Sequence, residues 1–108
     1  MSTRRVVVTG LGAITPVGNT VAESWKNLLA GVSGAATVDS FDTTGFATQF
    51  AASVKDFDVS QYMSAKDARK MDQFIHFGIA AGVQALDDAG LVVEDHDPER
   101  IGVAMGSV

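Results

Sequence analysis

The sequence contains no cysteine, which excludes a disulfide framework, a thiolate nucleophile and a cysteine metal site within these 108 residues. Basic residues are also scarce, because eight Lys and Arg stand against thirteen Asp and Glu for a formal net charge of -5. An acidic balance of this kind argues against a general affinity for nucleic acid or for an anionic membrane. Any basic binding site must therefore be local.

Long apolar runs are absent as well, and no stretch of 18 apolar residues predicts a membrane-spanning helix. Arg4 and Arg5 precede the valine run 6–8, an arrangement that superficially resembles the start of a secretory signal. Gly10 and Gly12 follow at once and interrupt any such apolar region. We therefore expect a soluble, cytoplasmic protein.

Histidine is limited to His76 and His96, and neither has a second ligand at metal spacing on one helix face. His76 is off the apolar stripe of its predicted helix and is expected to be exposed, while His96 is in an acidic turn. Asp87 and Asp88 are in polar surroundings that favour a solvated face over an acid/base pair. The sequence thus assigns no catalytic, cofactor-binding or metal-binding residue within the chain.

The remaining pattern predicts an α/β layered fold of one small domain, or part of one. Apolar runs next to glycine favour short strands, and capping pairs followed by apolar residues at helical spacing favour helices. A loop-rich excursion is expected between the helices. The predicted elements are a strand over Arg5–Thr9, a helix from Thr20 to Gly31, a half-buried strand over Thr48–Val54, a helix over Ser64–Ala89 and a strand over Ile101–Met105.

The glycine pair after the valine run invites a dinucleotide-binding interpretation, since glycine lets the backbone approach a pyrophosphate. That pattern fails at its third glycine, where Thr15 stands, and Pro16 follows it. The next helix begins only near Thr20, which is too late for a tight strand-to-helix turn. A structural turn at Gly10 and Gly12 is favoured, and a dinucleotide-binding oxidoreductase fragment is the less favoured alternative.

Three cations, Lys66, Arg69 and Lys70, have i, i+3, i+4 spacing, which predicts one basic patch on an exposed face of the long helix. Cations in the first turns of a helix oppose its macrodipole, so a binding role would explain the cost. The alternative is an ordinary solvated face neutralised by Asp67 and Asp72. Spacing alone favours the solvated face, and an acidic protein is the partner that best fits a binding role.

Several further segments, taken in order, resemble the opening of type II β-ketoacyl-acyl-carrier-protein synthases. They fall at that family's spacing across essentially all 108 residues, and the ordered set is far more specific than any one motif. The matching segments are Arg4 to Gly12, Thr15 to Asn19, Trp25, Leu28 to Gly31, Ser33 and Gly34, Phe41 and Asp42, Arg69 to Asp72, Ile101 and Gly102, and Gly106 and Ser107.

The resemblance implies a thiolase-like αβαβα fold, with residues 1–108 forming the amino-terminal part of its first half. It also implies a homodimer that elongates fatty acyl chains by decarboxylative condensation with malonyl-acyl carrier protein, without a metal or nucleotide cofactor. Lys66, Arg69 and Lys70 match family positions that contact the acidic carrier protein. The resemblance therefore favours carrier docking over a solvated face for these three residues.

In the family, a cysteine takes up the acyl group and two histidines assist the condensation. The resemblance implies that all three are located beyond residue 108, so the chain alone is expected to be inactive. Val108 stands where the family usually has glycine, which is a departure from its pattern. A noncatalytic carrier-binding module remains an alternative to a fragment of the enzyme.

Overall fold

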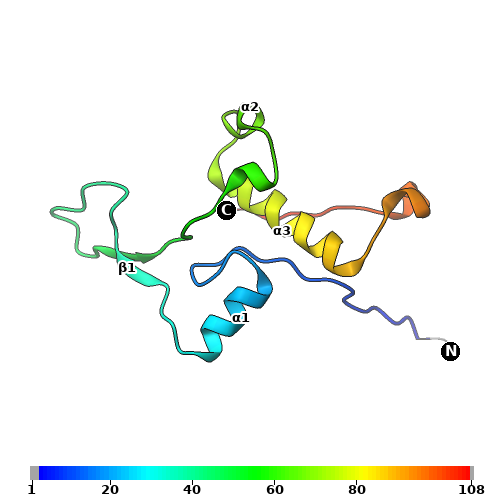
Figure 1. Cartoon of the computed structure of the whole chain (residues 1–108), viewed down its shortest axis with the longest axis horizontal. Coiled ribbons are helices and arrows are strands. Elements are labelled where there is room, and N and C mark those ends of the chain that lie inside the picture. Colours follow the sequence, from blue (N-terminus) through cyan, green and yellow to red (C-terminus); the bar gives the residue numbers. More distant parts are fainter. Residues whose placement is uncertain (1–2, 108) are drawn as a thin grey trace. The chain divides into compact units, whose positions relative to one another are not determined.

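The computed structural model describes residues 3–107, so Val108 and its departure from the family pattern are outside the described residues. Residues 3–107 form three α-helices, two paired strands and three short 3-10 helices, joined by irregular segments (Figure 1). In chain order, these are α1 (Val21–Leu29), β1 (Ala35–Thr37), β2 (Phe50–Ala52), η1 (Val59–Gln61), α2 (Ala65–Ala68), α3 (Gln73–Ala89), η2 (Val93–Asp95) and η3 (Pro98–Arg100).

The chain divides into two compact units. The hairpin unit is Ala13–Asp58, which contains α1 and the β1–β2 hairpin. The helical unit consists of the described residues up to Gly12 together with those from Val59 onward, and it contains α2 and α3. No linker in the sequence predicts this division.

Helix α1 confirms the predicted helix from Thr20. Thr20 is its N-cap, and the Thr20 hydroxyl accepts a hydrogen bond from the Glu23 backbone N–H at 3.1 Å. The Glu23 carboxylate in turn accepts from the Asn19 backbone N–H at 3.4 Å. The apolar face of α1 is uncovered, with Trp25 61% and Leu29 71% exposed.

The excursion between α1 and α2 contains the predicted second strand, although it is shorter than expected. β1 and β2 pair antiparallel, with Ala35 opposite Ala52 and Thr37 opposite Phe50. The expectation of a half-buried strand over Thr48–Val54 is wrong, because all three residues of β2 are exposed. A two-stranded hairpin has no second layer of its own to cover either face.

The long helix predicted over Ser64–Ala89 is interrupted. Ser64 is the N-cap of α2 as expected, since its hydroxyl accepts from the Asp67 backbone N–H at 3.2 Å. α2 ends after Ala68, and a new helix begins after Asp72, whose backbone is extended at φ -75° and ψ 163°. Asp72 is the N-cap of α3 by position, but its side chain makes no capping hydrogen bond, so the break lies in its extended backbone rather than in a side-chain cap. Gly90 ends α3 in the left-handed conformation, as predicted.

The two terminal strands are not formed. Arg5–Thr9 and Ile101–Met105 are irregular, and the β1–β2 hairpin is the only sheet among residues 3–107. Val6 and Val103 are 93% and 89% exposed. Apolar composition favours a buried strand, but a strand needs a hydrogen-bonding neighbour, and the described residues supply none here.

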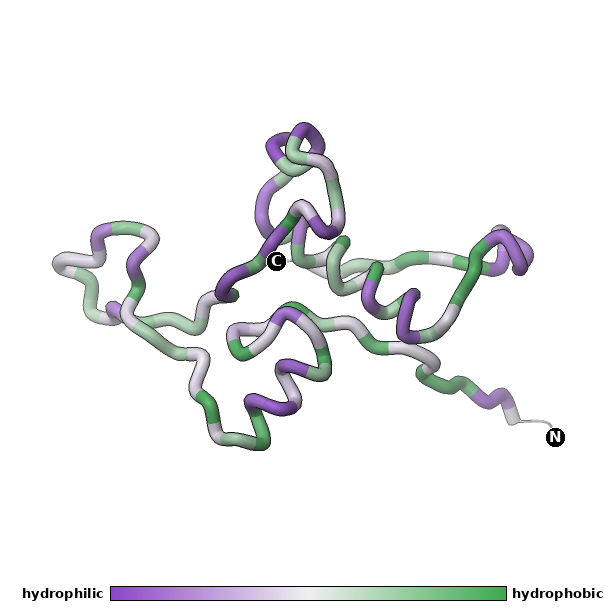
Figure 2. Tube along the Cα trace, in the orientation of Figure 1, coloured by the Kyte–Doolittle hydropathy of each residue, from purple (hydrophilic) through white to green (hydrophobic). Residues whose placement is uncertain are grey.

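Apolar burial is slight throughout the described chain. Ala80 in α3 is its only fully buried hydrophobic residue, and Ser24 in α1 is a buried polar one. Figure 2 shows hydrophobic residues along the N-terminal segment and along the segment after residue 100, where side chains are exposed. None of the helices within residues 3–107 has the length and apolar character needed to cross a bilayer.

Candidate functional site

The three predicted docking cations lie in the short α2 and the turn that follows it; we call Lys66, Arg69 and Lys70 together the cationic turn. Lys66 is in α2, Arg69 is its C-cap and Lys70 follows directly. The Arg69 backbone N–H donates to Ala65 at 3.2 Å and that of Lys70 donates to Asp67 at 3.0 Å, so the coil continues past the end of α2. The three residues therefore do not share a face of one long helix as predicted: they lie in and directly after the four-residue α2.

The electrostatic setting of this turn differs from the sequence-based expectation. The cations precede α3 rather than occupying its first turns, and Lys66 is in the short α2. Lys66, Arg69 and Lys70 are all exposed. This exposure is compatible both with a docking surface and with an ordinary solvated face.

Two side-chain hydrogen bonds fasten this region to α3. His76 Nε2 is 2.9 Å from the backbone oxygen of Ala68, the last residue of α2. Gln84 Nε2 donates to the Tyr62 hydroxyl at 2.9 Å. The expectation that His76 is exposed is wrong: the residue is half-buried, because its ring turns back toward α2.

Gly10 and Gly12 lie in an irregular segment against the backbone of α3. A side chain added at Gly10 would collide with the Ala85 carbonyl, and one added at Gly12 would collide with the Ala81 carbonyl. Both neighbours are helix backbone, which cannot move aside as a flexible side chain would. The space above these glycines is therefore filled by a helix rather than open to a pyrophosphate, but the expected turn is wrong, because residues 10–12 are irregular and form no turn.

Asp88 has a structural role that sequence analysis missed. Its carboxylate accepts a hydrogen bond from the Leu11 backbone N–H at 2.9 Å, between the two glycines that approach α3. Asp88 is exposed, as expected for it and Asp87, but its carboxylate also makes this contact. No local pattern indicates this contact, because the two residues are 77 positions apart.

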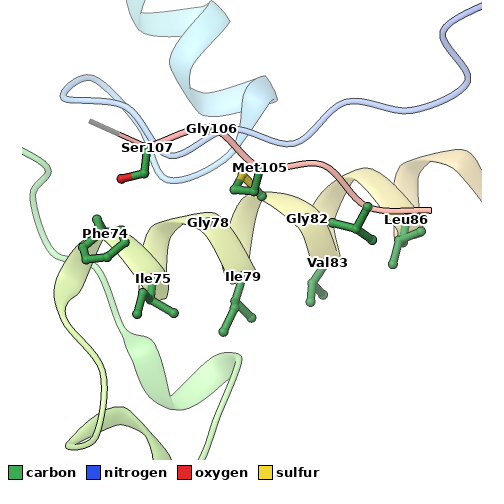
Figure 3. Close-up of a pocket in the computed structure, with 11 residues that line it drawn as sticks. Phe74, Ile75, Gly78, Ile79, Gly82, Val83, Leu86, Met105, Gly106 and Ser107 are labelled. Atoms are coloured by element: carbon green, nitrogen blue, oxygen red, sulfur yellow. The ribbon is translucent and has the colours of Figure 1, made fainter.

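An open apolar groove of about 660 Å³ runs along α3 in the helical unit. In Figure 3, Ile75, Ile79 and Val83 project from one side of the helix, and Met105 lies over Gly78. Ser107 supplies the only side-chain hydroxyl in the lining. A surface of this composition can bury apolar groups but offers no acid, base or thiolate for chemistry. The lining residues are Phe74, Ile75, Gly78, Ile79, Gly82, Val83, Leu86, Val103, Met105, Gly106 and Ser107.

The hairpin unit has a polar site centred on Lys55. The Lys55 ammonium donates to the backbone oxygens of Pro16 at 3.0 Å, Gly34 at 2.8 Å and Ser53 at 2.9 Å. Asn19 Nδ2 donates to the Lys55 backbone oxygen at 2.9 Å. All three ammonium hydrogens are thus engaged with carbonyl groups, so Lys55 holds chain segments together. Among residues 3–107, no group of three His, Cys, Asp or Glu side chains could hold a metal ion.

Comparison with known proteins identifies related sequences and structures. Residues 3–108 match the family described as "Beta-ketoacyl synthase, N-terminal domain". The chain is 64% identical over 107 residues to the 3-oxoacyl-[acyl-carrier-protein] synthase 2 of Vibrio cholerae serotype O1, which covers 99% of this chain and 26% of the relative. The chain spans about a quarter of the length of the curated relatives it matches.

Two solved structures are similar to most of the chain. The ishigamide ketosynthase/chain length factor matches with a TM-score of 0.74 at 38% identity, over 87% of this chain and 23% of that one. A type II PKS acyl-carrier protein in complex with its ketosynthase bound to the hexaketide matches with a TM-score of 0.65 at 31% identity and the same coverage. These matches confirm the thiolase-like α/β fold class. With the sequence match over residues 3–108, they show that the chain belongs to the β-ketoacyl synthase N-terminal domain family.

Proposed function

We propose that this chain is the amino-terminal part of a 3-oxoacyl-[acyl-carrier-protein] synthase that elongates fatty acyl chains by decarboxylative condensation with malonyl-acyl carrier protein. The observation that carries the proposal is the family match over residues 3–108, together with 64% identity to a 3-oxoacyl-[acyl-carrier-protein] synthase 2. The exposed apolar groove and valine run are the surfaces that the remainder of such an enzyme would cover.

The proposed contribution of this chain is docking and scaffold rather than chemistry. The sequence has no cysteine, so it has no thiolate that could take up an acyl group. His76 is engaged with Ala68, and His96 is in an exposed turn after η2. We expect the chain alone to release no carbon dioxide from malonyl-acyl carrier protein.

The proposed docking site is the cationic turn. Lys66, Arg69 and Lys70 are exposed, and an exposed positive cluster on a chain of net charge -5 selects and steers an acidic partner. A related ketosynthase has been solved in complex with its acyl-carrier protein, which supports a carrier protein as that partner. Homodimerisation and a cytoplasmic location belong to the same proposal for the parent enzyme.

Two alternatives have different experimental outcomes. A noncatalytic carrier-binding module would use the same cationic turn, and a coding region that continues beyond Val108 would argue against it. A dinucleotide-binding oxidoreductase fragment would use Gly10 and Gly12, but both glycines are packed against α3. Binding of NAD or NADP in a titration would favour that alternative over the synthase.

Calorimetric titration of holo-acyl carrier protein into the chain at low salt tests the docking proposal. Arg69→Glu introduces a like charge facing an acidic partner and is expected to weaken binding at least about five-fold. Lys26→Glu is the matched control, because Lys26 is an exposed cation on α1 in the hairpin unit. Equal affinities for the Arg69→Glu and Lys26→Glu variants would contradict docking at the cationic turn.

A further inference from the structure

We infer that His76 is a positioning residue for the cationic turn, an inference that rests on the proposed carrier docking. The contact joins His76 Nε2 to the Ala68 backbone oxygen at 2.9 Å. A carbonyl oxygen can only accept, so the ring nitrogen must be the donor. Ala68 directly precedes Arg69, and the bond therefore acts on the backbone that carries two of the three cations.

The Ala68 carbonyl is a junction between the cationic turn and α3. Besides the His76 ring, it accepts from the Met71 backbone N–H at 3.3 Å, which closes the chain around Arg69 and Lys70. The two donors together use both lone pairs of the oxygen. Loss of the ring donor would leave this closure to a single, long backbone hydrogen bond.

His76 is itself held firmly. It lies in the first turn of α3, where its backbone N–H donates to Asp72 at 3.4 Å and that of Ile75 donates to the same oxygen at 3.1 Å. α3 has 17 residues, whereas α2 has four. A single helical turn is unstable by itself because nucleation fixes several residues for one hydrogen bond. The short helix therefore depends on anchors to the long one.

A second hydrogen bond ties the chain to α3 on the other side of α2, at Tyr62. The Tyr62 hydroxyl, just after η1, accepts from Gln84 Nε2 at 2.9 Å. Between Tyr62 and Ala68, the Ser64 hydroxyl caps α2. The cationic turn is thus tied to α3 on both sides, and His76 is the anchor nearer to Arg69 and Lys70.

The consequence for binding is preorganisation. Lys and Arg side chains lose conformational freedom when they engage a partner, and ordering the backbone beneath them adds to that cost. If the turn is already held in place, binding does not have to order its backbone, and that part of the entropy cost is avoided. The lost anchor is expected to weaken carrier binding about three- to ten-fold without any change in the charges of the turn.

The test compares three substitutions in holo-acyl carrier protein titrations, with amide hydrogen exchange at residues 69–71 as a second readout. His76→Phe keeps a ring but removes the donor, and it should weaken binding about three- to ten-fold and speed exchange. His76→Gln keeps an N–H donor of similar reach and should restore binding to within about two-fold. His76→Asn is too short to reach Ala68 and should match His76→Phe, which preserves the comparison if the Phe variant fails to fold.

A double-mutant cycle separates positioning from a general loss of stability. Arg69→Ala should cost less affinity in the His76→Phe background than in the wild-type chain, because the anchor and the cation act together. Equal weakening by His76→Phe and His76→Gln would overturn the inference, as would wild-type affinity in His76→Phe. If Arg69→Glu leaves the affinity unchanged, the docking proposal itself fails, whatever the His76 variants do.

Discussion

The two compact units differ in which of their groups are satisfied within the chain. In the hairpin unit, apolar side chains such as Trp25 and Leu29 also stay exposed, but polar groups are paired: the Lys55 ammonium donates to three carbonyl oxygens, and the buried Ser24 hydroxyl donates to the Gly18 oxygen at 3.2 Å. In the helical unit, the apolar surface of α3 stays open as a groove of about 660 Å³. Local polar networks can close over short distances, whereas apolar burial needs area that a small chain lacks.

The largest expected effect tests how firmly residues 10–12 are packed on α3. Gly12→Ala places a methyl group against the Ala81 carbonyl and the Ala85 backbone N–H, so it should lower the free energy of unfolding by roughly 3 kcal/mol. Urea unfolding followed by circular dichroism measures this change. Gly82→Ala is the control within α3, because nothing lies within 4 Å of the added methyl group and helix propensity improves by roughly 0.5–1 kcal/mol.

If Gly12→Ala and Gly82→Ala shift the unfolding midpoint in the same direction, residues 10–12 are not packed on α3 as the structure describes. The description of the helical unit, and with it the contrast between the two units, would then be wrong.

In the hairpin unit, Lys55→Met tests the polar closure. The variant loses three charge-assisted hydrogen bonds, but Lys55 is exposed and solvent competes for them, so the expected loss is roughly 1–2 kcal/mol. Amide hydrogen exchange should become faster at the residues on either side of Pro16 and in the β1–β2 hairpin. Lys26→Met is the control, because Lys26 is an exposed lysine on α1, and it should change neither the stability nor the exchange rates. A similar effect from both variants would contradict the structural role of Lys55.

A smaller effect is expected at Asp88. Asp88→Asn weakens the hydrogen bond from the Leu11 backbone N–H, and Asp87→Asn removes the same charge near the same helix end without that bond. The shared electrostatic contribution of the helix C-terminus cancels in the comparison. Asp88→Asn should be less stable than Asp87→Asn by about 1 kcal/mol in urea unfolding. Identical midpoints would contradict the contact.

The smallest effect concerns the loop of the hairpin. Hydrogen bonds from the Thr44 hydroxyl and then from the Thr44 backbone N–H lower the pKa of Asp42 below its ordinary value of 3.8. A carboxylate with a lowered pKa stabilises the fold above its unfolded pKa and loses that contribution as pH falls through its folded pKa. Thr44→Val should raise the pKa of Asp42 toward 3.8 in an NMR titration. Thr43→Val is the control, and an unchanged pKa in both variants would exclude the hydroxyl as the cause.

Elements that local chemistry decides are the ones that the sequence predicts correctly. Thr20, Ser64 and Gly90 mark helix ends because capping depends on neighbouring backbone groups alone. Elements that depend on distant partners are predicted wrongly. The valine run has strand composition but no neighbouring strand in residues 3–107, and Asp72 interrupts an apolar pattern that by itself predicts one long helix.

The candidate site shows the same limit. Spacing predicted Lys66, Arg69 and Lys70 on one face of a long helix, but the helix is interrupted and the three residues lie in and just after the short α2. It did not predict that His76 and Asp88 use their side chains to hold backbone elements, since the contact of Asp88 spans 77 positions and that of His76 crosses a helix break. Lys55 likewise gave no signal, because its acceptors are backbone oxygens of any residue type.

The most direct test of the account is an NMR titration of the isotope-labelled chain with unlabelled holo-acyl carrier protein at low salt. The account predicts shift changes concentrated at residues 64–72, with the hairpin unit unaffected and the changes fading as salt screens the interaction. Changes concentrated in the β1–β2 hairpin, or none at any carrier concentration, would contradict carrier docking at Lys66, Arg69 and Lys70.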